Sequence, residues 1–370
     1  MTRLLNEKFQ VPWPGFPQTP KLGFPKALPM TINTKDLFRS SADVNSASED
    51  EFREIYFRLK NEGTRCSPRG QPVIEVENFT YELSPYVRFP NFVARKYSEM
   101  YVKNELLWYL RANKQDKTIV KHAKMWAELV NDDGIVNSNY GHYVFGQTGT
   151  RWFEANWQNQ FDNVIKTLTD DKDSRRASIM ILNSSHLFMV TKDVPCTYSM
   201  NFRIRDNKLN MSVHMRSQDA MFGMGNDAPA FSMFQEMIYI VLRDTTYPEL
   251  QLGAYHHICD SFHVYERHFE MLEQIISGDK FQPIVCPKIS NIDEVRHLRG
   301  TVHLEYRDGK QALTYPFVQE ANNHLEKAMH LIPNIASSIE RTQSTFEFSR
   351  WLLEGAHAAE EKEDYQKEPT

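Results

Sequence analysis

A strand hairpin followed by a largely apolar segment constrains the fold of this chain more than any other feature. Apolar and polar side chains alternate strictly through residues 198–204 and 209–215, as they do in strands with one buried face. Asp206 and Asn207 lie between them and tolerate the backbone angles of a tight turn. Residues 230–242 are apolar almost all round. The pattern predicts an antiparallel hairpin beside a buried helix.

The segment that joins the hairpin to this helix, residues 216–229, is polar and contains glycines. Ligand-binding groups are often held in such a loop, because rigid buried elements flank it. Further helices are predicted over residues 50–61, 103–110 and 118–130, and a further strand over residues 174–182.

The composition is that of a soluble globular protein, with 41% apolar and 25% charged residues in a chain of 370. The net charge of −5 argues against a general duplex-binding surface, so direct DNA binding is not expected. No apolar run approaches the roughly 18 residues of a membrane span, and the start lacks the apolar stretch of a secretory signal. We expect a cytoplasmic protein with no membrane partner.

The four cysteines have no CxxC spacing, so no metal site and no disulfide framework is indicated; they are Cys66, Cys196, Cys259 and Cys286. Six of the eighteen prolines lie within residues 12–29, which predicts an extended arm that packs through its aromatic residues. Residues 356–370 form a charged tail with little apolar content. The predicted division is an arm over 1–49, a catalytic domain over 50–335, and a C-terminal helix and acidic tail over 336–370.

Cys196 stands at the head of the hairpin. A lone intracellular cysteine is most often an inert buried residue. However, Arg175, Arg176 and Arg216 offer guanidinium groups, which lower a thiol pKa. Together with Ser217 they also supply the forked donors that a phosphate monoester requires. Adjacent arginines at a strand edge equally fit a solvated surface.

Eight motifs in a fixed order resemble the thymidylate synthase family, which includes the phage deoxycytidylate and deoxyuridylate hydroxymethylases. The resemblance covers roughly residues 50–335. The motifs are Glu105-Leu-Leu-Trp-Tyr-Leu, Trp126, Asn139-Tyr140-Gly141, Ser174-Arg175-Arg176, Pro195-Cys196, Arg216-Ser217-Gln218-Asp219, Gly223 and His263-Val-Tyr265-Glu-Arg-His268.

The resemblance implies an α/β (α+β) fold in which a large mixed β-sheet is flanked by helices and dimerises through the sheet. It implies a one-carbon transferase that uses 5,10-methylenetetrahydrofolate as co-substrate. Cys196 would be the nucleophile that adds to C6 of a pyrimidine nucleoside monophosphate, with Tyr140 among the catalytic residues. Glu105 lies in an apolar helix, which suits a raised pKa and proton handling through water.

The family's phosphate-binding groups can be carried over to Arg69, Arg216 and Ser217, although Arg65 competes with Arg69. Arg175 and Arg176 would reach the phosphate from the partner subunit, which implies a homodimer. His263 and Tyr265 lie two apart on one strand, and so on the same face, where they would bind the deoxyribose 3′-hydroxyl.

One position departs from the synthases in a way that decides the base. Where they carry a uracil-reading asparagine, the ungapped alignment places Asp227; a slip of one residue would place Asn226 there. A carboxylate cannot donate to uracil O4, but it accepts a hydrogen bond from the 4-amino group of cytosine. Thr197 and Met215 replace a histidine and a glutamine, which removes polar groups from the synthase network.

Folate contacts are implied for Trp126, Asp219, Phe222 and Gly223, although Leu129 replaces a frequent tryptophan. The expected reaction is C5 hydroxymethylation of dCMP with methylenetetrahydrofolate and water. The alternatives are a dUMP hydroxymethylase, a thymidylate synthase, or an inactive relative that binds nucleotide or RNA.

Overall fold

The computed structural model describes residues 41–146, 159–305 and 346–354. Residue contacts divide the chain into 1–39 and 40–370, and all described residues belong to the second unit. The predicted arm over residues 12–29 and the tail over 356–370 lie outside the described residues.

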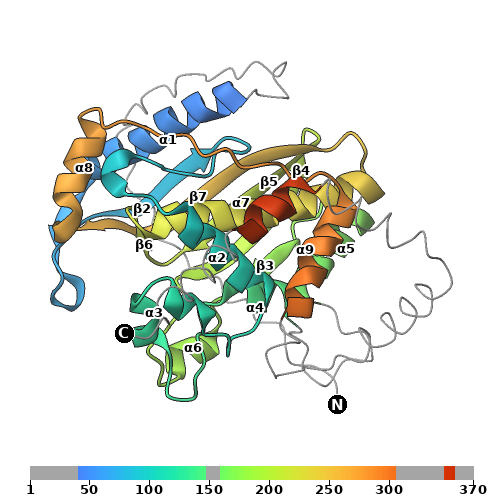
Figure 1. The fold of residues 1–370 in the computed structure, drawn as a ribbon, viewed down its shortest axis with the longest axis horizontal. Coiled ribbons are helices and arrows are strands. Elements are labelled where there is room, and N and C mark those ends of the chain that lie inside the picture. Colours follow the sequence, from blue (N-terminus) through green and yellow to red (C-terminus); the bar gives the residue numbers. More distant parts are fainter. Residues whose placement is uncertain (1–40, 147–158, 306–345, 355–370) are drawn as a thin grey trace, which may run out of the picture. The chain divides into compact units, whose positions relative to one another are not determined.

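A mixed seven-stranded sheet organises this unit (Figure 1), and it confirms the predicted fold class. The strand order is β1-β2-β7-β5-β4-β3, with β6 also paired to β7. The pairs of β7 with β5 and β6 are parallel, and the other pairs are antiparallel. The strands are β1 (Thr64–Cys66), β2 (Val73–Leu83), β3 (Ser178–Met180), β4 (Thr197–Arg205), β5 (Lys208–Met215), β6 (Gln218–Asp219) and β7 (Gln251–Tyr265).

The predicted hairpin is confirmed as β4 and β5. Asp206 and Asn207 form its turn with φ of 48° and 58°, so both are in the left-handed region. A two-residue turn of this kind matches the right-handed twist of the strands, and Asp and Asn tolerate its angles. The predicted strand over residues 174–182 is shorter in the structure, because only β3 pairs with β4.

Helix α7 (Gly223–Thr245) contains the predicted buried helix but begins inside the segment predicted as a loop. Pro229 lies inside this helix, and proline has no N–H for the carbonyl four residues earlier. In the structure, that carbonyl, on Gly225, accepts the Tyr97 hydroxyl at 2.8 Å instead. A side chain from outside the helix therefore permits the helical start, and no local sequence rule predicts it.

Helices predicted over residues 50–61 and 103–110 are present, but both begin earlier than predicted, α1 at Ser41 and α2 at Glu99. The single helix predicted over 118–130 is wrong. That range holds a 3₁₀ turn, η3 (Thr118–Lys121), and a separate short helix, since its first hydrogen bonds span three residues rather than four.

The α-helices besides α7 are α1 (Ser41–Glu62), α2 (Glu99–Leu110), α3 (Met125–Leu129), α4 (Tyr140–Phe145), α5 (Gln160–Asp170), α6 (Ser184–Phe188), α8 (Phe269–Ile276) and α9 (Ile292–Glu305). The other 3₁₀ turns are η1 (Pro68–Gly70), η2 (Val93–Arg95) and η4 (Glu266–His268). Residues 347–354 are also helical.

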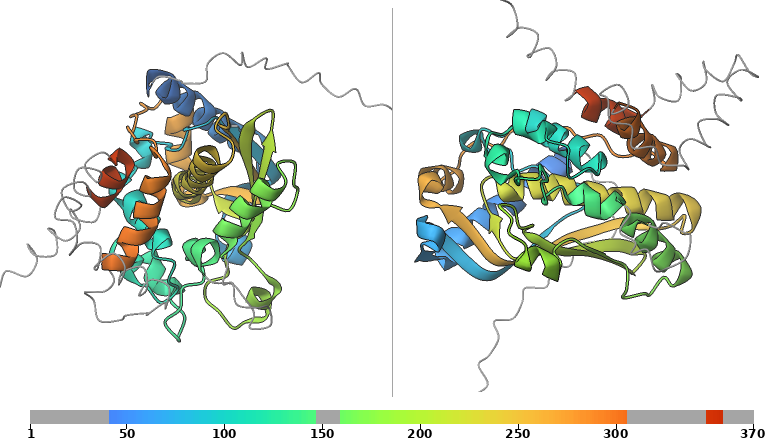
Figure 2. Two further views of the ribbon diagram at one scale, coloured as in Figure 1. Left: turned by 90° about the vertical axis from the view of Figure 1, so that its right-hand side faces the viewer. Right: turned by 90° about the horizontal axis from the view of Figure 1, so that it is seen from below.

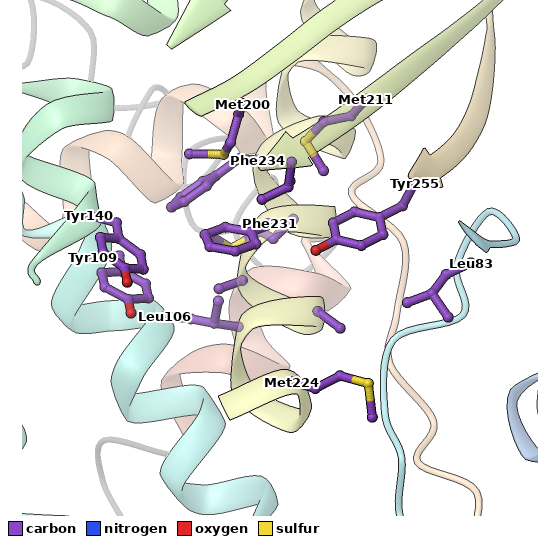
Figure 3. Close-up of a cluster of buried hydrophobic side chains, with 14 of the residues drawn as sticks. Leu83, Leu106, Tyr109, Tyr140, Met200, Met211, Met224, Phe231, Phe234 and Tyr255 are labelled. Carbon is purple, nitrogen blue, oxygen red and sulfur yellow. The ribbon is translucent and has the colours of Figure 1, made fainter. Parts of the chain in front are cut away.

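The main core lies between α7 and one face of the sheet. Figure 2 shows α2 (teal) and α7 (yellow) over that face in its right-hand view. Figure 3 shows side chains from α2, α4 and the strands converging on α7. Phe231 of α7 is fully buried, and its ring centroid lies 5.8 Å from that of Tyr140. Burial of this kind contributes roughly 1.5–3 kcal/mol per large apolar side chain.

The opposite face of the sheet is more polar and more exposed. We call it the open sheet face; it carries Asn201, Arg203, Ser212, His214, Ile258 and Asp260. His214 and Asp260 form an ion pair across β5 and β7 at 2.7 Å, with histidine charged only when protonated. Ile258 keeps 38% of its surface exposed although it lies on the long strand β7.

Candidate active site

Cys196 is held by Arg216 at the point where two strands meet. The Arg216 backbone N–H donates to the Cys196 carbonyl at 2.8 Å. The Arg216 guanidinium donates to the carbonyls of Pro195 and Val194 at 3.1 and 2.7 Å. The hairpin therefore holds Cys196 and Arg216 together, because Cys196 precedes β4 and Arg216 follows β5.

The thiol of Cys196 is more basic than the sequence suggested. Burial raises its pKa above the ordinary value, and the carboxylates of Asp227 and Asp193 raise it further. Arg216 and Arg69 lower it, as expected, but burial outweighs them. A pKa above the ordinary thiol value leaves Cys196 protonated at neutral pH.

Glu105 on α2 is a buried carboxyl, 4% exposed. It accepts hydrogen bonds from the hydroxyls of Tyr101 and Tyr109 at 3.1 and 3.4 Å. Burial raises the pKa of Glu105 to about 8, and the negative charge of Asp227 adds to the rise. The raised value agrees with the expectation from its apolar helix, and it leaves Glu105 protonated at neutral pH.

Trp126 is connected to the Glu105 carboxyl through Tyr101, a residue that the sequence analysis did not identify. Its indole N–H donates to the Tyr101 hydroxyl at 2.9 Å, and that hydroxyl donates to Glu105. Tyr109 lies four residues after Glu105 within the predicted helix, so helical spacing was a signal for it. Tyr101 lies before the predicted start at residue 103, and only the earlier start of α2 at Glu99 places it on the same helix.

Asp227 lies on the first turns of α7 rather than in a loop. Its Oδ2 accepts a hydrogen bond from the Gln218 side-chain amide at 2.9 Å. Burial raises the pKa of Asp227 to about 7, although the Gln218 hydrogen bond opposes the rise. The charge of Asp227 acts on both Glu105 and Cys196.

Tyr140 is the first residue of α4. It is 5% exposed, and its ring stacks on that of Tyr109 with centroids 5.5 Å apart. The charge of Cys196 acts on its hydroxyl. Thr197, which stands where the synthases have a histidine, is fully buried, and its side chain interacts with the Tyr140 hydroxyl.

The predicted phosphate groups fall into two sets. Arg69 is exposed at η1, and its charge acts on Cys196, whereas Arg65 lies over the Phe269 ring at 5.4 Å. This contrast favours Arg69 of the two candidates. Arg175 and Arg176 are exposed before β3, and they are not among the groups that act most strongly on the Cys196 thiol.

Ser217 lies between β5 and β6, directly after Arg216, and is half-buried. His263 and Tyr265 share one face of β7, as predicted, with ring centroids 5.1 Å apart. The His263 carbonyl accepts the Ala220 N–H at 2.8 Å, which fixes the loop after β6 to this strand.

Three of the four residues expected to contact folate, Asp219, Phe222 and Gly223, lie where β6 passes into α7, whereas Trp126 lies on α3. Asp219 accepts the backbone N–H groups of Met221 and Phe222 at 3.1 and 3.2 Å, so its carboxylate shapes the turn. Phe222 is 41% exposed and offers an aromatic surface. A Cβ on Gly223 would meet nothing closer than 3.5 Å. An exposed ring beside an open glycine fits the aromatic parts of a folate.

Within residues 41–146, 159–305 and 346–354, no group of three His, Cys, Asp or Glu side chains is placed to hold a metal ion. In the same part of the chain, no helix is long and apolar enough to cross a membrane.

Comparison with known proteins gives consistent matches. The Deoxycytidylate 5-hydroxymethyltransferase of Enterobacteria phage T4 is 29% identical over 236 residues, which cover 62% of this chain and 91% of that protein. The protein of the same name from Enterobacteria phage T6 has the same identity over the same length. The Deoxyuridylate hydroxymethyltransferase of Bacillus phage SP01 is 26% identical over 220 residues, 58% of this chain and 56% of that protein.

A family model described as Thymidylate synthase matches residues 50–308, well over half of the chain and all of the sheet. The chain therefore belongs to the thymidylate synthase family.

Proposed function

We propose that this one-carbon transferase adds a hydroxymethyl group to C5 of a pyrimidine deoxynucleoside monophosphate, and that its substrate is dCMP. One observation carries the proposal: the Cys196 thiol and the carboxyls of Glu105 and Asp227 lie close enough for the charge of Asp227 to raise the pKa of both others. A nucleophile, a proton carrier and a base-reading carboxylate are the groups that this reaction needs.

In the proposed reaction, Arg69 and Arg216 with Ser217 hold the 5′-phosphate, and His263 and Tyr265 hold the 3′-hydroxyl. Cys196 gives up its proton and bonds to C6, which makes C5 a nucleophile. Methylenetetrahydrofolate, placed against Trp126, Asp219, Phe222 and Gly223, supplies the one-carbon unit. C5 then loses its proton as tetrahydrofolate leaves from the new carbon, which becomes an exocyclic methylene. Water adds to that methylene, and Cys196 leaves from C6 as the C5–C6 double bond re-forms.

Two side chains distinguish this scheme from simple binding. Glu105 holds a proton at neutral pH, so it can deliver that proton to the ring and recover it in the same cycle. The ionised form of Asp227 accepts a hydrogen bond from the cytosine 4-amino group, and a protonated N3 gives a second, charge-assisted contact.

A second candidate substrate, dUMP, is favoured by the raised pKa of Asp227. Because this pKa is about 7, a neutral carboxyl is present in part at neutral pH, and its O–H can donate to uracil O4. The SP01 relative carries a deoxyuridylate name. With dUMP, transfer of a methyl group would make the chain a thymidylate synthase in activity as well as family.

The proposal includes a homodimer formed through the open sheet face. This face exposes Ile258 beside polar side chains, which suits an interface that a second copy covers. Arg175 and Arg176 are exposed before β3, so they are free to reach the partner's phosphate site.

The test is incubation of the chain with methylenetetrahydrofolate and dCMP or dUMP carrying tritium at C5. Tritium release from dCMP and a hydroxymethyl product by mass spectrometry are expected. Cys196→Ala should stop release while nucleotide binding persists, and Cys286→Ala is the matched control that should leave release unchanged. A methylated product, or faster release from dUMP, would replace the dCMP assignment.

A further inference from the structure

We propose that Gln218 is a positioning residue for base selection: it holds Asp227 in one orientation and keeps its carboxylate an acceptor. The inference rests on the proposed role of Asp227 toward the base, and it assigns the substrate preference to a second side chain. Gln218 is 2% exposed, so it acts through Asp227 and not by contact with bulk solvent.

The hydrogen bonds around Gln218 allow one orientation of its amide. An ionised Asp227 can only accept, so the Gln218 Nε2 must face it, at 2.9 Å from Oδ2. The Gln218 Oε1 then faces the Tyr81 hydroxyl at 3.2 Å, which donates to it. The same Nε2 lies 3.5 Å from the Met215 sulfur, a weak acceptor. All polar atoms of the amide are therefore engaged.

Tyr81, which donates to the Gln218 amide, is itself fixed by packing within the sheet. The ring of Tyr81 on β2 stacks on His257 of β7 with centroids 4.6 Å apart and planes 7° apart. His257 is fully buried, and its Nδ1 lies 2.6 Å from the Tyr255 hydroxyl. Since β2 and β7 are paired along most of their length, Tyr81 cannot leave Gln218 without disturbing the sheet.

Two consequences follow for the base. The Gln218 donor occupies Oδ2 of Asp227, which leaves Oδ1 for the 4-amino group of cytosine. The donor also stabilises the ionised form, and so opposes the rise in pKa that burial causes. Without it, Asp227 would hold its proton to higher pH and would offer an O–H to uracil O4.

Other titratable groups around Asp227 do not replace this donor. The Asp227 carboxylate interacts with the charge of Asp219 on β6. It also acts on titratable groups of α2, α4, β2, β7 and the segment before β4, namely Glu105, Tyr101, Tyr109, Tyr140, Tyr81, Tyr255, Cys259 and Cys196. None is a cation. Among the described residues, the hydrogen bond to the Asp227 carboxylate comes from the Gln218 amide.

The test compares Gln218→Met with Gln235→Met. Methionine keeps the length and removes both amide hydrogen bonds. Gln235 is equally buried, but its amide donates to the backbone carbonyls of Leu209 and Gly253 and not to Asp227. In Gln218→Met, the acidic limb of kcat/KM for dCMP should move up by about one pH unit, and the preference for dCMP over dUMP at pH 7 should fall about tenfold. Gln235→Met should move neither.

The role of Gln218 is overturned if Gln218→Met and wild type share the same acidic limb and the same base preference. Should Gln218→Met fail to fold, Tyr81→Phe frees the amide to turn and should shift both readouts in the same direction. A ¹³C NMR titration of the Asp227 carboxyl, assigned with Asp227→Asn, needs no turnover. An unmoved titration overturns the inference, whereas a wild-type enzyme inactive on both nucleotides overturns the proposed function alone.

Discussion

At the scale of single residues, we expect Asp227 to decide between dCMP and dUMP. Asp227→Asn replaces an acceptor by an amide that matches both O4 and N3–H of uracil and opposes a donor to the cytosine amino group. An opposed buried polar group costs about 1–3 kcal/mol, so kcat/KM for dCMP should fall roughly tenfold or more while that for dUMP rises. Steady-state kinetics with both nucleotides measure the change.

The neighbouring Asn226 provides the control for this prediction. Asn226→Ala should leave the ratio of the two kcat/KM values unchanged, since its side chain is not expected to read the base. If Asn226→Ala shifts the ratio while Asp227→Asn does not, the alignment of this segment is wrong by one residue.

Glu105 makes the stability of the fold depend on pH. The pKa of Glu105 is about 8 in the folded state against an ordinary value of 4.5, so unfolding releases its proton between these pH values. The free energy of unfolding therefore falls as pH rises through that window. Glu105→Gln has no proton to lose, so its stability relative to wild type should improve by roughly 1–3 kcal/mol between pH 5 and pH 8. Denaturant unfolding at both pH values tests this, and an equal pH dependence in the two proteins would contradict it.

At the scale of elements, the close approach of α4 to the end of α2 depends on Gly141. A Cβ at this position would lie 1.6 Å from the Tyr109 carbonyl oxygen, a backbone atom that cannot move without the helix. Gly141→Ala should separate Tyr140 from Tyr109 and reduce the free energy of unfolding by about 3 kcal/mol. Denaturant unfolding measures the loss.

Gly223→Ala is the matched control, because the same methyl group would meet its nearest atom at an ordinary 3.5 Å. Its free energy of unfolding should change by less than about 1 kcal/mol. If the two alanine variants are equally stable, close packing of α4 on α2 is not what selects glycine at position 141.

At the scale of the whole molecule, the proposed dimer places the arginines and nucleophile of one site on different subunits. Arg176→Ala and Cys196→Ala, each inactive alone, should recover activity when their subunits exchange. Random exchange at equal amounts gives about half mixed dimers, each with one intact site, so about a quarter of wild-type activity is expected. Tritium release after mixing measures it, and no recovery despite demonstrated exchange would place each site within one chain.

The sequence by itself predicted the parts of this protein that depend on local order. Strict alternation identified β4 and β5, and Asp206 with Asn207 identified their turn, because strand period and turn angles are properties of a few neighbouring residues. The order of motifs predicted the family, and an apolar helix around Glu105 predicted its raised pKa. These features need no knowledge of distant contacts.

Only the tertiary structure decided the features that combine distant segments. The early start of α7 depends on the Tyr97 hydroxyl, which takes the carbonyl that Pro229 leaves free. The pKa of Cys196 rises because burial outweighs two arginines, and a sequence does not report burial at that point. Gln218 meets Asp227 and Tyr81 only because β6 pairs with β7 and β7 with β2. Hydrogen bonds and charges act through space, so the environment of each group is fixed only when the whole sheet and its helices have packed.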